Sequence, residues 1–362
     1  MRYCMKVAII GAGLAGLACA HELKRNGIIP TIFEKKGYIG EILDLPAIDL
    51  NMFRMGIRDP IRYLREKYQI NITHHYDLKE ISMVSHSKTY TVKGNMGHIF
   101  LRGREKGYLT TQMENAVSLS YTFNTLVNPE ELKYDYDYIL VATGTLEIPI
   151  QMNLASVQFD SYVRIATVLG SFNVNSVKVW INTRYAKHGY AYLVPVTGKD
   201  ARIVLIVNNI TLKELDYYWD TFLSSENIRY TIIETKDLRH TVGSVFPVQV
   251  GNLYFAGNAG GCLDSVLGFG TLKSILSGAI AAECMIKGLD YNKKMKAVQR
   301  DVKAKYEFRK ALNTLNNDGL DRLLKMENLP GLKQFIFNNP ILRVTQGTFL
   351  VKAYNTVKNS KD

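Results

Sequence analysis

Near the N-terminus, the spacing of hydrophobic residues changes from that of a strand to that of a helix and then back to that of a strand. Val7–Ile10 is a short apolar run rich in β-branched residues, which predicts a buried parallel strand. Ala20 and Leu23 then recur at helical spacing, and Gly27 is a typical helix stop. A second apolar run, Thr31–Phe33, predicts another strand. This order predicts a strand–helix–strand unit whose two strands are parallel.

Three glycines occupy the start of this unit, between its first strand and its helix. Gly11 permits a tight turn, Gly13 lets the backbone approach a ligand, and Gly16 lets the helix pack against the strand. The helix N-terminus presents free N–H groups that favour a phosphate anion. Glu34 follows the second strand, where its carboxylate can bind a ribose hydroxyl and disfavours a 2′-phosphate. Together these features predict a dinucleotide-binding unit.

Later apolar runs predict further strands, several of which follow one another with few helices between them. Such a succession is typical of a mainly antiparallel sheet. The predicted strands are Lys79–Val84, Lys88–Lys93, Tyr121–Val127, Ser161–Leu169, Val177–Asn182, Tyr190–Val194, Arg202–Val207 and Tyr230–Glu234. The predicted helices are Arg58–Gln69, Tyr108–Val117, Leu212–Ser224 and Thr271–Ile286, then C-terminal helices interrupted at Gly319, Pro330 and Pro340. Residues 35–60 are expected to be irregular.

The chain of 362 residues exceeds the usual size of a single hydrophobic core, so two lobes are expected. The first is an α/β, Rossmann-like lobe, and the second is an α+β lobe that holds the substrate. We assign residues 1–45, 95–148 and 243–290 to the first lobe, 46–94 and 149–242 to the second, and 291–362 to a helical C-terminal region.

Two later stretches place small residues after an apolar strand. One strand ends on Ala142-Thr143-Gly144, where small residues let another group lie against the backbone. Another strand runs into Gly257-Asn258, and Gly268-Phe269-Gly270 precedes the helix that follows. The N-terminus of that helix offers a second set of free N–H groups. A second strand–loop–helix unit so late in the chain predicts a large, extended ligand.

Composition excludes several classes of protein. The chain is 47% hydrophobic and 22% charged, which is typical of a globular protein. There is no apolar run of about twenty residues, so we expect no transmembrane helix. The first apolar run belongs to the dinucleotide unit, which leaves no room for a signal peptide. The four cysteines show no metal-binding spacing, and we expect free thiols, a cytoplasmic location and no metal site.

The net charge of +12 is concentrated near the C-terminus, where residues 287–362 contain sixteen Lys and Arg but only seven Asp and Glu. A solvated helical face is the first interpretation of this charge, and weak peripheral contact with anionic lipid is the second. We expect no nucleic-acid partner, because no nucleic-acid-binding motif accompanies the basic residues.

The three glycine-containing motifs, in this order, resemble the FAD motifs of the para-hydroxybenzoate-hydroxylase-like flavoprotein fold. The stretch Lys187–Pro195, KHGYAYLVP, is similar to the aromatic-x-aromatic-x-x-Pro motif of geranylgeranyl reductases, and flavin halogenases carry a related motif. The resemblance covers about residues 1–290. The chain departs from it in reading Gly257-Asn258 where the family has Gly-Asp, and in placing Ser265 after Asp264.

The resemblance implies non-covalent FAD and a set of residues around it. It implies that Val127 contacts the adenine through its backbone, and that Gln112 or Arg102 replaces an arginine of the family. The implied cofactor-binding residues are Gly11, Gly13, Ala15, Gly16, Glu34, Lys35, Arg102, Gln112, Val127, Thr143, Gly144, Gly257, Asn258, Gly268, Phe269 and Gly270. Tyr190, Tyr192 and Pro195 would bind the substrate, although ordinary strand packing explains the two tyrosines equally well.

The resemblance implies an FAD-dependent oxidoreductase, and first of all a reductase of carbon–carbon double bonds in an isoprenoid or other small apolar substrate. A flavin monooxygenase is the alternative, and a non-catalytic flavin electron carrier or binding protein is a third reading. The sequence contains no second glycine fingerprint for a nicotinamide. We therefore expect reduction by transient NAD(P)H or by an electron-donor protein. His188 is a candidate proton donor, but no catalytic residue can be assigned.

Overall fold

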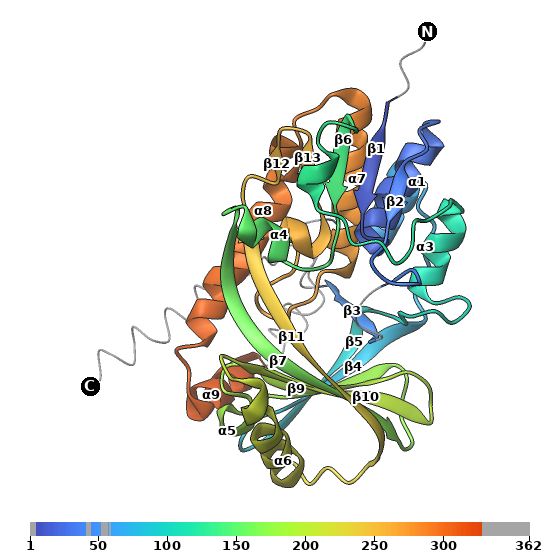
Figure 1. Cartoon of the computed structure of the whole chain (residues 1–362). Coiled ribbons are helices and arrows are strands. Elements are labelled where there is room, and N and C mark those ends of the chain that lie inside the picture. The colour runs from blue at the N-terminus through green and yellow to red at the C-terminus, as the bar shows by residue number, and fades with distance from the viewer. Residues whose placement is uncertain (1–4, 41–44, 52–56, 58, 328–362) are drawn as a thin grey trace.

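The computed structural model describes residues 5–40, 45–51, 57 and 59–327, which form two lobes, each built on one β-sheet (Figure 1). The first sheet has five strands, and four of them are parallel. Every residue of its interior strand β1 is buried, which accounts for the continuous apolar run in the sequence. In order, the strands are β12 (Gln249–Val250), β13 (Leu253–Phe255), β6 (Tyr138–Val141), β1 (Val7–Ile10) and β2 (Thr31–Phe33).

Two helices, α1 (Leu14–Arg25) and α7 (Thr271–Lys287), form the main core of the first lobe against its sheet. They pack closely at Gly278, where an added Cβ would lie 2.0 Å from the carbonyl oxygen of Ala15. This contact fixes the N-terminal ends of both helices on the same side of the lobe. The same core includes α2 (Pro60–Tyr68) and α3 (Leu109–Val117), and the other face of the sheet contacts η2 (Pro129–Leu132), α4 (Glu147–Gln151) and η4 (Gly257–Gly260).

The second lobe is a curved eight-stranded sheet in which all pairs are antiparallel except β4–β8. Its order is β11 (Thr231–Val245), β7 (Ala155–Leu169), β10 (Asp200–Asn208), β9 (Tyr190–Pro195), β8 (Ser176–Trp180), β4 (Tyr76–Val84), β5 (Thr89–Phe100) and β3 (Ala47–Leu50). The outer face packs against α5 (Thr183–Ala186) and α6 (Leu215–Ser225), and the short exposed helix η3 (Leu212–Glu214) precedes α6. The opposite face carries Tyr190 and Tyr192 in a separate apolar cluster.

The two longest strands, β7 and β11, run through both lobes (Figure 1). They have 15 residues each and pair continuously from Thr231 opposite Leu169 to Val245 opposite Ala155, with two register shifts. Val245 lies in the core of the first lobe, whereas Val163 and Ile165 lie in that of the second. A single two-stranded ribbon therefore joins the two lobes.

The C-terminal helices also connect the lobes. Helix α8 (Tyr291–Leu312) begins in the core of the first lobe, and α9 (Asn317–Glu327) places Leu324 in that of the second. The predicted break at Gly319 is wrong, because Gly319 lies inside α9, where its N–H donates to Asn316 Oδ1 at 2.9 Å. Pro330 and Pro340 lie outside the described residues. In the described part of the chain, no helix is long and apolar enough to span a membrane.

Four other predictions differ from the structure. The predicted strand Tyr121–Val127 forms only an isolated bridge to β2, and its backbone turns at Asn124, which has a positive φ of 53°. The stretch expected to be irregular contains β3, which pairs with β5. Strand β5 extends to Phe100, so the boundary between the lobes falls there and not at residue 95. Helix α2 packs on the first lobe, where the Tyr68 hydroxyl donates to Glu283 at 2.9 Å.

Candidate cofactor and substrate site

The glycine turn after β1 holds its shape through close backbone packing. Gly11 has a φ of +105°, and an added Cβ would lie 2.4 Å from the carbonyl oxygen of Ala142. At Gly16 an added Cβ would lie 2.0 Å from the carbonyl oxygen of Gly11. Gly13 differs, because it has an ordinary φ of −84° and an added Cβ would meet no described atom within 4 Å. The open space beside Gly13 belongs to the cavity, so a ligand in the cavity can contact the backbone of this turn.

The N-terminus of α1 opens into this space. Gly13 is the N-cap, so no side chain caps the helix, and the first turn contains no acidic residue. Leu14 and Ala15, whose N–H groups have no partner inside the helix, both line the cavity. Unpaired N–H groups and the helix dipole make this end suitable for a pyrophosphate.

Glu34 stands at the end of β2 on the same cavity wall. It is 6% exposed, and its Oε2 accepts a hydrogen bond from the Ala12 N–H at 2.8 Å. Its Oε1 accepts from the Lys36 N–H at 3.0 Å. A carboxylate has about four lone-pair positions, so these two bonds orient Glu34 and leave capacity for the hydroxyls of a ribose.

The cavity lies between the lobes and has a volume of about 510 Å³. Besides the N-terminal turn, it is lined by the end of β6, by the turn after β13 and by the start of α7. Most of the residues implied by the resemblance meet here, namely Gly11, Gly13, Ala15, Glu34, Lys35, Arg102, Thr143, Gly144, Gly257, Asn258, Gly268, Phe269 and Gly270. Tyr192 from β9 also reaches it.

Asn258 provides a test of whether these residues fit FAD. Its Nδ2 donates to the Gly144 carbonyl oxygen at 2.9 Å, while its Oδ1 is buried and has no partner among the described residues. A buried acceptor without a donor is costly, and a ribityl hydroxyl would satisfy it. Helix α7 adds an N-terminus with Gly270 as N-cap and no side-chain cap. The donors, the acceptor and the open glycine backbone therefore fit FAD.

Three of the implied cofactor residues do not line the cavity, and each has another role. Gly16 packs α1 against the preceding turn. Gln112 is held away, because its Nε2 donates to the Gly107 carbonyl oxygen at 2.7 Å and its Oε1 accepts from the Thr73 N–H at 2.8 Å. Val127 follows the turn at Asn124 and lies outside the residues that form the cavity. Arg102 does line the cavity, and its Nε donates to the Leu45 carbonyl oxygen at 2.7 Å.

A second cavity, of about 210 Å³, adjoins the first on the inner face of the second sheet. We call it the apolar chamber. It shares Tyr192, Leu267 and Phe269 with the cofactor cavity. Tyr190 lines the chamber, and its hydroxyl donates to the Leu267 carbonyl oxygen at 2.6 Å. Pro195 lines neither cavity, because it lies buried at the far end of β9.

Sequence reasoning missed the roof of the chamber, which α8 and α9 supply. The two helices and the loop between them contribute Phe308, Arg309, Leu312, Leu315, Leu320, Leu323 and Leu324. Apolar residues at helical spacing are the sequence signal for a buried helix face, and here that face covers a cavity.

Arg309 is the one roof residue that carries a charge. It is 8% exposed, and its Nη1 donates to the Val266 carbonyl oxygen at 3.3 Å. Its Nε has no hydrogen-bond partner among the described residues. Burial lowers the pKa of Arg309 to about 10, so the guanidinium remains a cation near neutral pH. His188 lies on the same chamber wall, and burial together with the charge of Arg309 lowers its pKa.

His240 is another residue that sequence reasoning missed. It lines the cofactor cavity beside Gly268, where an added Cβ would lie 3.0 Å from its Nε2. Burial lowers the pKa of His240, which favours the neutral imidazole.

A family model described as pyridine nucleotide-disulphide oxidoreductase matches residues 5–178, and this domain implies binding of FAD and NAD(P). The matched residues, just under half of the chain, are similar to an FAD-dependent oxidoreductase domain. The fold of the chain is that of the para-hydroxybenzoate-hydroxylase-like flavoproteins, as solved structures show. A geranylgeranyl bacteriochlorophyll reductase-like protein from Thermoplasma acidophilum aligns over 93% of this chain and 96% of that chain, with a TM-score of 0.73 and 15% identity. The flavin-dependent brominase Bmp2 aligns over 98% and 99%, with a TM-score of 0.65 and 13% identity.

Curated relatives match this chain over shorter stretches. The glutamate synthase [NADPH] small chain of Escherichia coli is 53% identical over 47 residues, which is 12% of this chain and 10% of that protein. A flavin-dependent monooxygenase from an unknown prokaryotic organism is 24% identical over 160 residues, 39% of either chain. The chain thus spans between a tenth and two fifths of these relatives, whose activities do not transfer to it.

Proposed function

We propose that the enzyme uses non-covalent FAD to reduce a carbon–carbon double bond in a small apolar substrate, such as an isoprenoid. The apolar chamber is the observation that supports this proposal. Its walls are mainly aliphatic and aromatic, and it meets the cofactor cavity at Tyr192, Leu267 and Phe269. An apolar chain that enters the chamber loses water-exposed surface at a gain of about 25 cal/mol per Å².

Each part of the chain has a distinct task in this proposal. Bound FAD, once reduced, would supply the hydride, and His188 or solvent would supply the proton that completes the saturated bond, while the protein binds, orients and encloses the reactants. Tyr192 is fixed from two sides, because its ring stacks on Tyr190 at 5.7 Å and meets the edge of Phe269 at 5.9 Å. This packing holds the boundary between cofactor and substrate rigid. Transient NAD(P)H or an electron-donor protein would provide the reducing equivalents.

Arg309 suggests that the substrate carries an anionic group at one end. The guanidinium is buried in the roof and hydrogen-bonds only a neutral carbonyl among the described residues. A carboxylate or phosphate beside it would offset the cost of burying the cation. The substrate would then be an apolar chain with an acidic end, held with its double bond toward the cofactor cavity.

An anaerobic reoxidation experiment tests the proposed reaction. The flavin is photoreduced without oxygen, alkenes with and without an acidic end are added, and its absorbance is followed. Reoxidation by an alkene, with the saturated product found by mass spectrometry, is the expected result. Turnover of oxygen that needs a ligand would instead identify a monooxygenase, the activity of one curated relative. Reduced flavin that persists in both experiments would identify a carrier.

A chamber-filling variant connects this reaction to the structure. Leu323→Trp narrows the apolar chamber and should slow reoxidation by long alkenes, while flavin content stays unchanged. Leu212→Trp is the matched control, because Leu212 is 50% exposed on η3, away from the chamber. Equal alkene turnover by the two variants would show that the substrate does not occupy the chamber.

We also propose weak, reversible contact of the enzyme with anionic lipid, where such apolar substrates reside. Helix α8 supports this, because its exposed residues include a row of cations: Lys293, Lys294, Lys296, Arg300, Lys303 and Lys310. Each cation near an anionic surface contributes about 1 kcal/mol, and salt weakens the attraction. Sedimentation with anionic vesicles at low salt, but not with neutral ones, is expected. A protein that stays in the supernatant in both cases has a basic face that is only solvated.

A further inference from the structure

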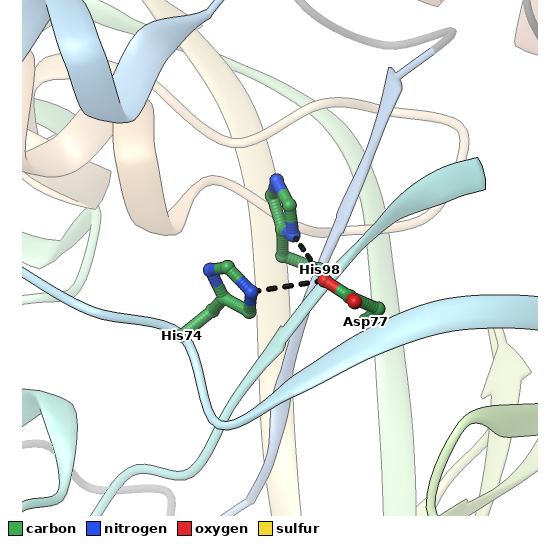
Figure 2. A group of neighbouring side chains, drawn as sticks. All are labelled: His74, Asp77 and His98. Atoms are coloured by element: carbon green, nitrogen blue, oxygen red, sulfur yellow. Dashed lines mark hydrogen bonds and ion pairs between the residues drawn. The ribbon is translucent and has the colours of Figure 1, made fainter.

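Two histidines and an aspartate meet on the second lobe, outside both cavities. His74 lies in the segment before β4, Asp77 is the second residue of β4, and His98 is near the end of β5. Asp77 and His98 are direct partners in the antiparallel ladder, so their side chains share one face of the sheet. Figure 2 shows both imidazole rings side by side, with a nitrogen of each turned toward the Asp77 carboxylate.

The distances in this cluster match those between the ligands of one metal ion. His74 Nε2 lies 3.0 Å from Asp77 Oδ1, and His98 Nδ1 lies 3.6 Å from the same oxygen. The three ligand atoms all lie within 4.8 Å of one another. Around a tetrahedral ion with bonds of about 2.0–2.1 Å, neighbouring ligand atoms are about 3.3 Å apart. Rotation of the side chains, with the backbone unchanged, would therefore bring all three atoms to a common ion.

The backbone around the cluster is fixed before any ion binds. The His75 N–H donates to the Ile99 carbonyl oxygen at 2.9 Å, which holds the segment beside β5. The Asp77 carbonyl oxygen accepts from Asn175 Nδ2 at 2.7 Å, which ties β4 to the turn before β8. The two histidine rings stack at 4.0 Å between centroids, and they would have to tilt for both ring planes to contain one ion. The backbone, in contrast, is already held in place and loses little conformational entropy when an ion binds.

The surroundings allow an ion to enter and to keep a water ligand. The side chains of His74, Asp77 and His98 are 34%, 49% and 20% exposed, respectively. Lys79 is the nearby cation, but its Nζ lies 4.0 Å from Asp77 Oδ2 and leaves Oδ1 to the histidines. Among the described residues, His74, Asp77 and His98 form the group of three His, Cys, Asp or Glu side chains whose ligand atoms lie close enough together to bind one ion.

We propose that His74 Nε2, His98 Nδ1 and Asp77 Oδ1 bind one divalent transition-metal ion of the Zn²⁺ class, with water completing its coordination. Two imidazoles and one carboxylate suit Zn²⁺ and its neighbours, whereas Mg²⁺ and Ca²⁺ prefer an all-oxygen set. The ion would link the segment before β4 to β5. Strand β5 ends two residues before Arg102, which lines the cofactor cavity, so the ion would stabilise that wall from outside.

Calorimetric titration of the tag-free, chelator-treated flavoprotein with Zn²⁺ tests the site. One equivalent should bind, and saturation should raise the melting temperature. His98→Ala and Asp77→Asn should each weaken Zn²⁺ binding at least tenfold. His86→Ala is the matched control, since His86 is exposed in the turn between the same two strands and lies outside the cluster. Its affinity for Zn²⁺ should equal that of the unchanged protein.

Several results would overturn the site. Absence of saturable Zn²⁺ binding would do so, as would equal affinities of all three variants, which would indicate only adventitious binding. Asp77→Asn keeps the shape of the side chain, so it remains informative if His98→Ala does not fold. As a second readout, Co²⁺ in a site of this kind should give visible ligand-field bands that Asp77→Asn alters and His86→Ala leaves unchanged.

Discussion

Replacement of Gly13 by valine should separate flavin binding from folding. Gly13 has a φ of −84° and a ψ of −176°, which any residue can adopt, and an added Cβ meets no described atom within 4 Å. Loss of a glycine from the unfolded chain by itself stabilises a protein by about 0.4–1 kcal/mol where the backbone is compatible. Valine is a poorer N-cap than glycine, which offsets this gain, so the flavin-free variant should melt close to the temperature of the flavin-free parent.

The same valine should remove most of the affinity for FAD. Its side chain would occupy the cavity beside the free N–H groups of Leu14 and Ala15, where the pyrophosphate is expected. A hydrogen bond to a charged group contributes about 1.5–3 kcal/mol, so loss of two such bonds costs about 3–6 kcal/mol. That loss corresponds to an increase of about 10²- to 10⁴-fold in the dissociation constant of FAD.

Gly16→Val is the matched control, because there the branched side chain meets the backbone and not the cavity. An added Cβ at Gly16 would lie 2.0 Å from the Gly11 carbonyl oxygen, so this variant should lose both flavin and stability. The assay combines flavin absorbance after purification with thermal unfolding of both flavin-free variants. Full flavin content in Gly13→Val would refute the placement of the pyrophosphate, and equal destabilisation by the two substitutions would refute the geometric argument.

Three further predictions concern the identity of the flavin, the role of Arg309 in the chamber roof and the stability of the protein at low pH. The flavin released by heat should be FAD and not FMN, because the site offers the uncapped N-terminus of α1 and the Glu34 carboxylate to an ADP half that FMN lacks. Chromatography of the released flavin distinguishes the two. Arg309→Met should raise KM for an acidic alkene by about 10- to 150-fold, the equivalent of 1.5–3 kcal/mol, and leave that for a neutral alkene unchanged; equal effects on both would contradict an anion site. Although burial opposes it, hydrogen bonds from Lys67, Tyr68 and Lys287 lower the pKa of Glu283 to about 2 from its ordinary 4.5. Its stabilising contribution is thus complete above about pH 4.5 and is lost as the pH falls towards 2, so Glu283→Gln should destabilise the protein at pH 7 and have little effect near pH 2, as unfolding curves at the two values will show.

The sequence predicted what depends on neighbours along the chain. The turn from Gly11 to Gly16 and the acid Glu34 lie within one strand–helix–strand unit, so spacing alone was enough to place them around a common cavity. The prediction for Gln112 was wrong because its amide bonds two loops at once, through Nε2 to Gly107 and through Oε1 to Thr73, and no local sequence pattern indicates these contacts.

The remaining features depend on residues that are distant in sequence. Asp77 and His98 meet only through the register of β4 and β5, and a bulge in β4 shifts that register after Leu78. The roof of the chamber comes from α8 and α9, whose apolar face looks like that of any helix on a core. The predicted strand Tyr121–Val127 had a suitable alternation, but positive φ at Asn124 ends its alignment with β2.

The stiffness of the ribbon formed by β7 and β11 affects how an apolar substrate can reach the chamber. A pair of strands with 15 residues each is about 50 Å long, and bending it sharply would break hydrogen bonds along its ladder. The ribbon therefore resists a hinge motion that would separate the two lobes. Helix α9 is held on the second lobe along its length, because Asn317 accepts from the Thr183 N–H at 2.9 Å, Asp321 accepts from the Ser87 hydroxyl, and Leu324 packs in the core of that lobe. The apolar chamber is therefore enclosed between elements that are held in place on both sides, so an apolar substrate has to fit its preformed shape.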